Sequence, residues 1–220
     1  MSETLLSLRG LCFAYDGGAP VLDGLDLELK AGERLGLAGA NGSGKTTLLH
    51  LIVGLVRPSA GEIRAFGQVR RQDRDFEEVR RRAGLLFQDP EDQLFCPTVA
   101  EDVAFGPLNL GLPRAEAMDI VRDTLDQLGL AGYEERITYR LSGGEKRLVS
   151  LAAVLAMRPD VLLLDEPANE LDEEHTARLL AILDDLPQAA IIVSHSRELL
   201  HRTSTRCLRL VGGAAEPWEP

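Results

Sequence analysis

The chain has 220 residues, of which 45% are hydrophobic, and this is enough to bury the core of one sizeable domain. Its 35 acidic and 24 basic residues give a net charge of −11, which would repel a phosphate backbone and argues against nucleic acid as the main partner. The three cysteines are single and widely spaced, a pattern that fits neither a zinc site nor a disulfide framework.

The sequence shows no sign of a membrane span or of export. Its apolar runs fall far short of the roughly 20 residues that a membrane-spanning helix needs. The first residues, from Met1 to Thr4, lack the basic and apolar parts of a secretory signal. We therefore expect the chain to remain in the cytosol.

Predicted strands and helices alternate along the chain. Leu25, Leu27 and Leu29 alternate with acids, which predicts a half-buried strand, whereas the apolar runs at 161–164 and 189–193 predict strands covered on both faces. Helical periodicity marks residues 45–55, 114–128, 145–157 and 173–183. This alternation predicts an α/β fold with a mainly parallel sheet, flanked by a small antiparallel sheet at the N-terminal side.

The middle of the chain has a different character. Residues 98–157 show helical patterns without a convincing strand, and Thr98 with Glu101 forms the pattern of a capping box. We find no internal repeat and no low-complexity linker. We therefore expect one domain over residues 1–220 with a helical subdomain at approximately 90–157.

The clearest motif lies between a predicted strand at 34–38 and a helix that opens at Lys45. It matches G-x-x-x-x-G-K-[ST] and comprises Gly39, Ala40, Asn41, Gly42, Ser43, Gly44, Lys45 and Thr46, with Thr47 next in sequence. The glycines let backbone N–H groups close around phosphates at a helix N-terminus. Lys45 supplies a positive charge to the β- and γ-phosphates, and the Thr46 hydroxyl can ligate Mg²⁺. The sequence therefore predicts a nucleoside triphosphate site.

Two acids follow a predicted buried strand. Asp165 and Glu166 come directly after the apolar run at 161–164. A triphosphatase needs a carboxylate for Mg²⁺, which Asp165 would supply, and a group that accepts a proton from the attacking water or orients it, which Glu166 would supply. The alternative is that both acids end a strand in a solvated turn before Pro167, but this does not account for the independent phosphate loop.

The sequence Leu-Ser-Gly-Gly-Glu at 141–145 resembles the signature motif of the ATP-binding cassette (ABC) superfamily. Ser142, Gly143 and Gly144 at the start of a helix make a second anion-binding end. The family places this signature against the γ-phosphate bound to a partner subunit. The resemblance thus implies an ABC ATPase that uses ATP and Mg²⁺ and acts as a head-to-tail dimer of two copies or of this chain and a paralogue.

The resemblance covers nearly the entire chain and implies roles for four further residues. Tyr15 resembles the aromatic that stacks on adenine, Gln88 the glutamine that senses Mg²⁺ and water, Asp172 the loop aspartate, and His195 the switch histidine that contacts the γ-phosphate. Three of them have an alternative: a packed strand aromatic for Tyr15, a surface polar residue for Gln88 and a core histidine for His195. The carboxyl edge of a strand, where His195 is expected, favours the functional role.

A longer segment narrows the resemblance. Residues 87–107 are similar to the energy-coupling factor class, especially its cobalt and nickel importer ATPases. The resemblance implies a groove between Gln88 and Phe105 that receives a helix of a transmembrane coupling protein, and a peripheral location on the cytoplasmic face of the cell membrane. Leu94, Phe95 and Phe105 would leave apolar surface for such a helix, although Phe105 could equally pack inside the helical subdomain.

The sequence departs from the family pattern at two positions. Ala168 stands where Thr or Ser is usual, and Glu170 adds a carboxylate near the expected dimer seam, where a small residue is common. A non-transport ABC ATPase is a poor alternative because the chain has no coiled-coil or zinc insertion between its motifs. A nucleotide-binding regulator should lack Glu166. A vitamin or another importer substrate stays open as the cargo.

A run rich in arginine, from Arg70 to Arg82, could approach lipid headgroups, but acids are interspersed, and the pattern favours a solvated helix face.

Overall fold

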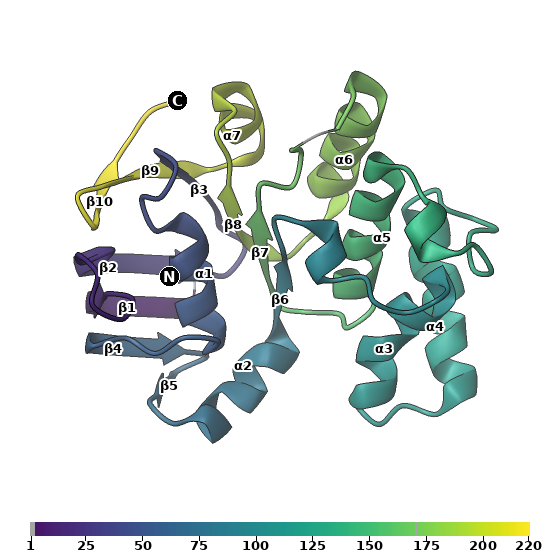
Figure 1. Ribbon diagram of the computed structural model, residues 1–220, viewed down its shortest axis with the longest axis horizontal. Coiled ribbons are helices and arrows are strands. Elements are labelled where there is room, and N and C mark those ends of the chain that lie inside the picture. Colours follow the sequence, from purple (N-terminus) through teal and green to yellow (C-terminus); the bar gives the residue numbers. More distant parts are fainter. Residues whose placement is uncertain (1–2, 170) are drawn as a thin grey trace. The chain divides into compact units, whose positions relative to one another are not determined.

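The computed structural model describes residues 3–169 and 171–220 and divides the chain into two compact units (Figure 1). The first unit takes in the residues up to 85 together with 160–166 and 187–220. The second takes in 86–159 and 167–186. In the described part of the chain, no helix is both long enough and apolar enough to cross a membrane.

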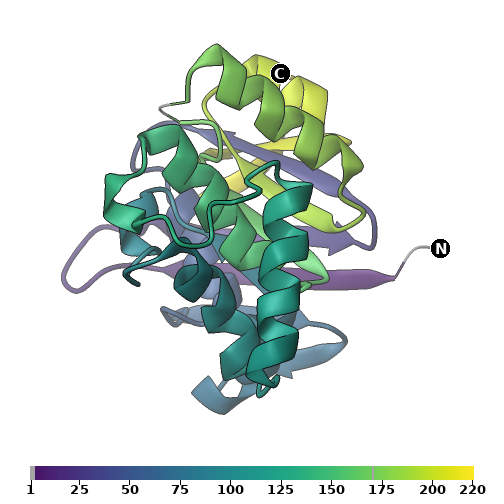
Figure 2. The same ribbon diagram turned by 90° about the vertical axis from the view of Figure 1, so that its right-hand side faces the viewer.

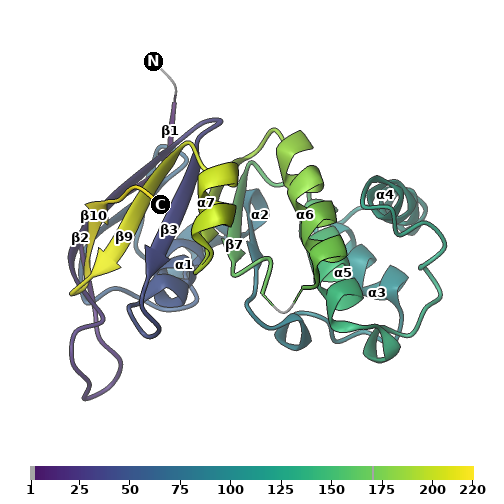
Figure 3. The same ribbon diagram turned by 90° about the horizontal axis from the view of Figure 1, so that it is seen from above.

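A mainly parallel sheet forms the centre of the first unit (Figure 3). Its strands, in spatial order, are β10 (Ala214–Pro217), β9 (Arg206–Val211), β3 (Arg34–Gly39), β8 (Ala189–Val193), β7 (Val161–Asp165) and β6 (Ala83–Leu86). Strand β3 pairs in parallel with β8 and β9, and β7 with β8, whereas β10 runs antiparallel to β9. Every residue of β7 and β8 is buried, as their continuous apolar sequences predict.

A smaller antiparallel sheet accompanies it, as the alternating leucines predict. Its order is β2 (Leu22–Lys30), β1 (Thr4–Phe13), β4 (Ala60–Ala65) and β5 (Gln68–Arg70). Leu8 pairs with Leu27 across the ladder, and both are buried while their neighbours in sequence are more exposed. The predicted fold class, a parallel sheet with an antiparallel flank and helices, is confirmed.

Helix α1 (Lys45–Val53) joins the two sheets through one hydrophobic core. Seven of its nine residues are buried, and Leu48 and Ile52 belong to the same cluster as Leu8 and Leu35. Full burial of one such side chain contributes about 1.5–3 kcal/mol. Two further helices, α2 (Phe76–Arg82) and α7 (Arg197–Thr203), and the 3₁₀ turn η1 (Asp73–Asp75) complete the first unit.

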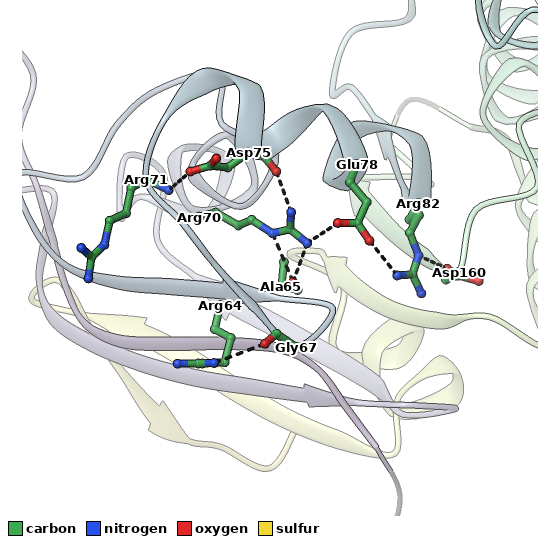
Figure 4. Close-up of polar contacts among 9 residues, drawn as sticks. All are labelled: Arg64, Ala65, Gly67, Arg70, Arg71, Asp75, Glu78, Arg82 and Asp160. Atoms are coloured by element: carbon green, nitrogen blue, oxygen red, sulfur yellow. Dashed lines mark hydrogen bonds and ion pairs between the residues drawn. The ribbon is translucent and has the colours of Figure 1, made fainter.

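The arginine-rich run is not a uniformly solvated face, because Arg70 is buried. Its guanidinium donates to the Ala65 carbonyl at 3.2 and 2.9 Å, to the Asp75 carbonyl at 2.8 Å and to the Glu78 carboxylate at 2.6 Å (Figure 4). The bond from Arg70 lowers the pKa of Glu78. An arginine suits this place because the several N–H donors of its guanidinium satisfy two backbone carbonyls and one carboxylate at once.

Arg82 extends this network toward the strand that carries the acidic motif. It donates to Glu78 at 3.2 Å and to Asp160 at 2.6 Å, and its guanidinium lies 3.8 Å from the centre of the Phe66 ring. Asp160, the residue before β7, also donates its backbone N–H to the Arg82 carbonyl at 2.8 Å. The network therefore fastens the start of β7 to α2 within the first unit.

The second unit is built from helices, drawn in teal and green in Figure 2. These are α3 (Val99–Asn109), α4 (Arg114–Gln127), α5 (Gly143–Leu155) and α6 (Glu173–Asp185), with 3₁₀ turns η2 (Pro90–Asp92) and η3 (Thr138–Arg140). The capping box at the start of α3 forms as its sequence pattern predicts: Thr98 accepts from the Glu101 N–H, and the Glu101 carboxylate accepts from the Thr98 N–H. This unit takes in α6, beyond the approximate range 90–157 expected for a helical subdomain.

Candidate nucleotide-binding site

The phosphate-loop motif connects the end of β3 to the start of α1. Its glycines are needed for space as well as for backbone freedom. Gly44 has φ 100°, and a Cβ there would lie 2.8 Å from Cγ1 of Val21. A Cβ at Gly39 would lie 2.5 Å from the Ser43 hydroxyl. The loop thus has the tight curvature that aims backbone N–H groups at an anion at the helix N-terminus.

Lys45 lies across this loop. Its ammonium donates to the carbonyl oxygens of Gly39 and Ala40, each at 3.0 Å, and the residue is buried. Burial lowers the pKa of Lys45, while the carboxylates of Glu166 and Asp165 act in the opposite direction. The charge is therefore held at the place where phosphate oxygens can replace the two carbonyl oxygens.

The next residue contacts the acidic motif directly. The Thr46 hydroxyl donates to a carboxylate oxygen of Asp165 at 2.6 Å, and Asp165 is 3% exposed at the end of β7. A hydroxyl and a carboxylate side by side are hard oxygen ligands of the kind that Mg²⁺ takes together with waters and phosphate oxygens. The residues present fit a magnesium site.

Glu166 has a strained backbone and a buried carboxylate. Its φ of 47° is left-handed for a residue with a side chain, which costs of the order of 1–3 kcal/mol. Its N–H donates to the Val193 carbonyl at 3.0 Å. Burial raises the pKa of Glu166, the neighbouring His195 and Lys45 oppose this, and Asp165 adds to it. A carboxylate of raised pKa is a stronger base toward water.

His195 lies against that carboxylate. Its Nε2 is 3.2 Å from one oxygen of Glu166, and its backbone N–H donates to the other oxygen at 3.2 Å. The imidazole remains half exposed, so it is not a packed core histidine. Asp165 pairs with Val193 across β7 and β8, and Val193 with Leu37 across β8 and β3, so the three motifs emerge at one edge of the sheet.

Tyr15 belongs to the same unit and contacts the helix that follows the phosphate loop. Its phenol oxygen lies 3.0 Å from the Thr47 hydroxyl, and its ring meets Phe13 edge to face with centroids 4.8 Å apart. About half of the residue, 52%, stays exposed. Tyr15 therefore packs on Phe13 and still leaves part of its side chain open to solvent, where a base could stack.

Gln88 and the signature motif belong to the second unit. Gln88 is exposed in the loop after β6. Arg147 of α5 donates to the carbonyls of Gln88 and, at 2.6 Å, of Phe87, and so holds this loop on the signature helix. Sequence reasoning assigned no role to Arg147, since a single arginine inside a helix carries no motif.

Ser142 is the N-cap of α5. Its hydroxyl accepts from the Glu145 N–H, and the Glu145 carboxylate accepts from the Ser142 N–H at 2.8 Å. This bond and one from the Tyr133 hydroxyl lower the pKa of Glu145 to about 2. A Cβ at Gly144 would lie 2.8 Å from the His175 ring, whereas the Cβ position at Gly143 is open. The helix N-terminus is thus capped by Ser142 and open at Gly143.

Asp172 caps the next helix. Its carboxylate accepts from the His175 N–H at 2.8 Å at the start of α6, and this bond lowers the pKa of Asp172. The departure at Glu170 lies outside the described residues.

The comparisons with known proteins agree with this geometry. The profile of the family described as ABC transporter matches residues 22–169. The chain is 59% identical over 215 residues to a Brucella suis protein provisionally named as an ABC transporter ATP-binding protein, with 98% of this chain and 89% of that protein covered. It is 41% identical over 215 residues to the energy-coupling factor transporter ATP-binding protein EcfA of Methanothermobacter thermautotrophicus, with 95% and 68% covered.

Solved structures share the fold. One is cbiO1 from Clostridium perfringens, described as part of the ABC transporter complex cbiONQ, with a TM-score of 0.87 and 30% identity over 97% of this chain and 87% of that one. Another is a dimeric post-hydrolysis state of the ATP-binding cassette MJ0796 bound to ADP and inorganic phosphate, with a TM-score of 0.88 and 25% identity over 96% and 97%.

The profile spans the phosphate loop, the signature motif and the acidic strand, which are the parts that the structure places at strand ends and helix starts. Relatives of the energy-coupling factor class match nearly the whole chain. The chain therefore belongs to the ABC transporter family and is an ATPase of the energy-coupling factor type.

Proposed function

We propose that this chain is the ATP-hydrolysing subunit that powers a membrane importer, with cobalt or nickel ions as the cargo. The observation that carries the hydrolytic part is the cluster at one edge of the parallel sheet: Lys45 and Thr46 on the phosphate loop, Asp165 and Glu166 after β7, and His195 after β8. The similarity to EcfA and to cbiO1 supports the transporter class.

Binding of ATP falls to the first unit. The phosphate loop, residues 39–46 with Thr47, encloses the phosphates, and the Lys45 ammonium moves from the loop carbonyls to the β- and γ-phosphates. The open face of Tyr15 stacks on the adenine. Mg²⁺ held by Thr46 and Asp165 would neutralise charge on the phosphates, and the family resemblance assigns Gln88 to the same ion.

Hydrolysis depends on Glu166 and His195. The Glu166 carboxylate accepts a proton from the attacking water or orients it, and its raised pKa suits that task. The exposed imidazole of His195 donates a hydrogen bond to the γ-phosphate and reports its presence to the carboxylate beside it. Phosphoryl transfer needs no covalent enzyme intermediate, so positioning and charge do the work.

A second ABC ATPase subunit completes each site. Ser142, Gly143 and Gly144 of one subunit contact the γ-phosphate on the other, because a helix N-terminus with an accessible Gly143 suits an anion. The partner is a second copy or a paralogue. The dimeric state of MJ0796 with ADP and phosphate supports this arrangement.

The docking surface for a transmembrane coupling protein lies between Gln88 and Phe105. Phe95 is 64% exposed and Phe105 is 47% exposed, and such an exposed apolar pair suits an apolar helix of a membrane partner. This docking places the chain peripherally on the cytoplasmic face of the membrane. The cargo itself is selected by membrane subunits.

Uptake of cobalt and nickel by cells that express this chain with its membrane subunits tests the proposal, with Glu166→Gln as the hydrolysis-deficient control. We expect metal uptake that the substitution abolishes. ATPase activity without metal uptake would contradict the cargo and favour a vitamin or another importer substrate.

A further inference from the structure

The exposed aromatic pair of the second unit has an unusual arrangement. Phe95 lies in the loop after η2 and Phe105 on α3, and their rings meet edge to face with centroids 4.8 Å apart. The ring contact stabilises the pair but leaves large apolar surface in water. The orientation of Phe95 therefore needs support from elsewhere in the unit.

Asp102 provides this support through the backbone of the loop that carries Phe95. The residue is 4% exposed and lies in the first turns of α3, three positions before Phe105. One of its carboxylate oxygens accepts the N–H groups of Phe95 at 3.0 Å and Cys96 at 2.9 Å. Two adjacent backbone donors on one charged oxygen fix the local course of the loop that carries Phe95.

This carboxylate is not needed to cap the helix. Thr98 and Glu101 already form the capping box of α3. The Asp102 side chain turns instead to the loop before the helix and, through its other oxygen, to Thr138, whose hydroxyl donates at 3.0 Å. A buried carboxylate is costly unless it is fully bonded, and three donors meet that requirement here.

Thr138 opens the 3₁₀ turn η3, which leads into the signature motif. Its N–H donates to the Pro97 carbonyl at 3.1 Å, and the Val99 N–H donates to the Arg136 carbonyl at 3.1 Å. The segment that precedes Ser142 is therefore bonded to the same loop that Asp102 holds.

We propose that Asp102 is a positioning residue that presents the Phe95–Phe105 pair to an apolar helix of the membrane partner and links this pair, through Thr138, to the signature motif. This inference rests on the proposed function, because the docking surface belongs to it. Preorganisation of the pair lowers the ordering cost of docking, so loss of the carboxylate weakens the response of the ATPase to its partner.

Three substitutions separate the contacts of Asp102. Asp102→Leu removes all three hydrogen bonds at similar size. Asp102→Asn retains them, because its amide oxygen can accept the two N–H groups while its NH₂ donates to the Thr138 hydroxyl. Thr138→Val removes only the side-chain bond from Thr138 to Asp102 and leaves the backbone bonds of its segment to Pro97 and Val99 in place. Asp123→Asn, at an exposed acid on α4, is the matched control.

Hydrogen exchange of the full chain measures the positioning itself. We expect the backbone amides of residues 95 and 96 to exchange about tenfold faster in Asp102→Leu and at the wild-type rate in Asp102→Asn and Asp123→Asn. Equal protection in Asp102→Leu and wild type would overturn the proposal. If Asp102→Leu does not fold, the same comparison with Asp102→Ala decides.

The second readout is the ratio of ATPase rates with and without the membrane subunits, in vesicles of phosphatidylethanolamine and phosphatidylglycerol. We expect this ratio to fall about tenfold in Asp102→Leu, to fall partly in Thr138→Val, and to stay within about twofold of wild type in Asp102→Asn. Because each variant is compared with its own basal rate, a general loss of activity does not mimic the effect.

Phe95→Ala separates the two proposals. If Phe95→Ala lowers the ratio and Asp102→Leu does not, Asp102 has no positioning role although the docking surface stands. If Phe95→Ala and Asp102→Leu both leave the ratio unchanged, the docking surface is wrong, and this inference fails with it. If Phe95→Ala and Asp102→Leu both lower the ratio and Asp102→Asn keeps it near the wild-type value, the positioning role is supported.

Discussion

The Thr46 hydroxyl donates a hydrogen bond to the Asp165 carboxylate at 2.6 Å, although 119 positions separate the two residues in sequence. The contact exists because β3 and β7 both pair with β8, so the phosphate loop and the acidic motif emerge at the same edge of the sheet. The hydrogen bond keeps the Thr46 hydroxyl beside the Asp165 carboxylate, so that both oxygens are available as ligands for Mg²⁺.

Thr46→Val should weaken ATP binding only when Mg²⁺ is present. The substitution removes an oxygen ligand at constant size and leaves Lys45 and the loop N–H groups in place. We expect about tenfold weaker binding of a fluorescent ATP analogue with Mg²⁺ and little change with a chelator. Thr47→Val, which removes the bond to Tyr15, is the control, and it should not alter the effect of Mg²⁺. Equal weakening of Thr46→Val in both conditions would contradict the metal role.

Glu166→Gln should bind ATP yet hydrolyse it about 10²- to 10⁴-fold more slowly, because an amide cannot accept the proton of the attacking water. The rate of phosphate release and light scattering of the ATP-bound protein check both halves. We expect the variant to accumulate as an ATP-bound dimer. Hydrolysis at the wild-type rate would remove Glu166 from the mechanism, and a monomer with ATP would count against the shared site.

Glu145→Gln should change the pH dependence of stability. The pKa of Glu145 is about 2 in the folded chain against an ordinary 4.5, chiefly because its carboxylate accepts from the Ser142 N–H and the Tyr133 hydroxyl. A lowered folded-state pKa means that the ionised carboxylate stabilises the fold above pH 4.5, and this contribution is lost as the pH falls toward 2.

We therefore expect Glu145→Gln to lower the free energy of unfolding by about 1 kcal/mol at neutral pH, with the difference shrinking between pH 4.5 and 2. Urea unfolding at a series of pH values gives the answer. A difference that stays constant over this range would show that the charge of Glu145 does not contribute.

Arg70→Met should destabilise the first unit. Methionine keeps the apolar stem but leaves the Ala65 and Asp75 carbonyls without their donor and Glu78 without its buried partner. We expect a loss of about 2–3 kcal/mol in the free energy of unfolding. Arg71→Met, at an exposed neighbour, should cost less than about 0.5 kcal/mol in the same urea titration. Similar losses in the two variants would argue against the buried network.

Residue patterns predicted the parts of this fold that depend on local chemistry. The glycines around Lys45 predicted a phosphate loop, and the continuous apolar runs before Asp165 and His195 predicted two strands covered on both faces. Because these strands end at the same edge of the sheet, they bring the three residues together. Alternation of leucines from Leu25 onward likewise predicted the antiparallel flank. The roles of the individual site residues remain predictions until variants are measured.

Other features could not be predicted because they depend on long-range packing. The burial of Arg70 depends on the β4–β5 turn and on α2, whereas its sequence surroundings suggest a solvated face. The three donors to Asp102 come from 95, 96 and 138, and no spacing rule joins them. The left-handed backbone of Glu166 occurs together with a backbone bond to Val193, and a glutamate in the sequence does not predict it.

Val21, the residue before β2, packs beside the phosphate loop, since a Cβ at Gly44 would lie 2.8 Å from its Cγ1. The segment that enters β2 therefore borders the nucleotide site. Nucleotide binding and the packing of β1 and β2 should then be linked equilibria, and ATP at a hundred times its dissociation constant adds about 2.7 kcal/mol to the stability of the folded state. ATP should accordingly protect β1 and β2 of a newly made chain from proteolysis.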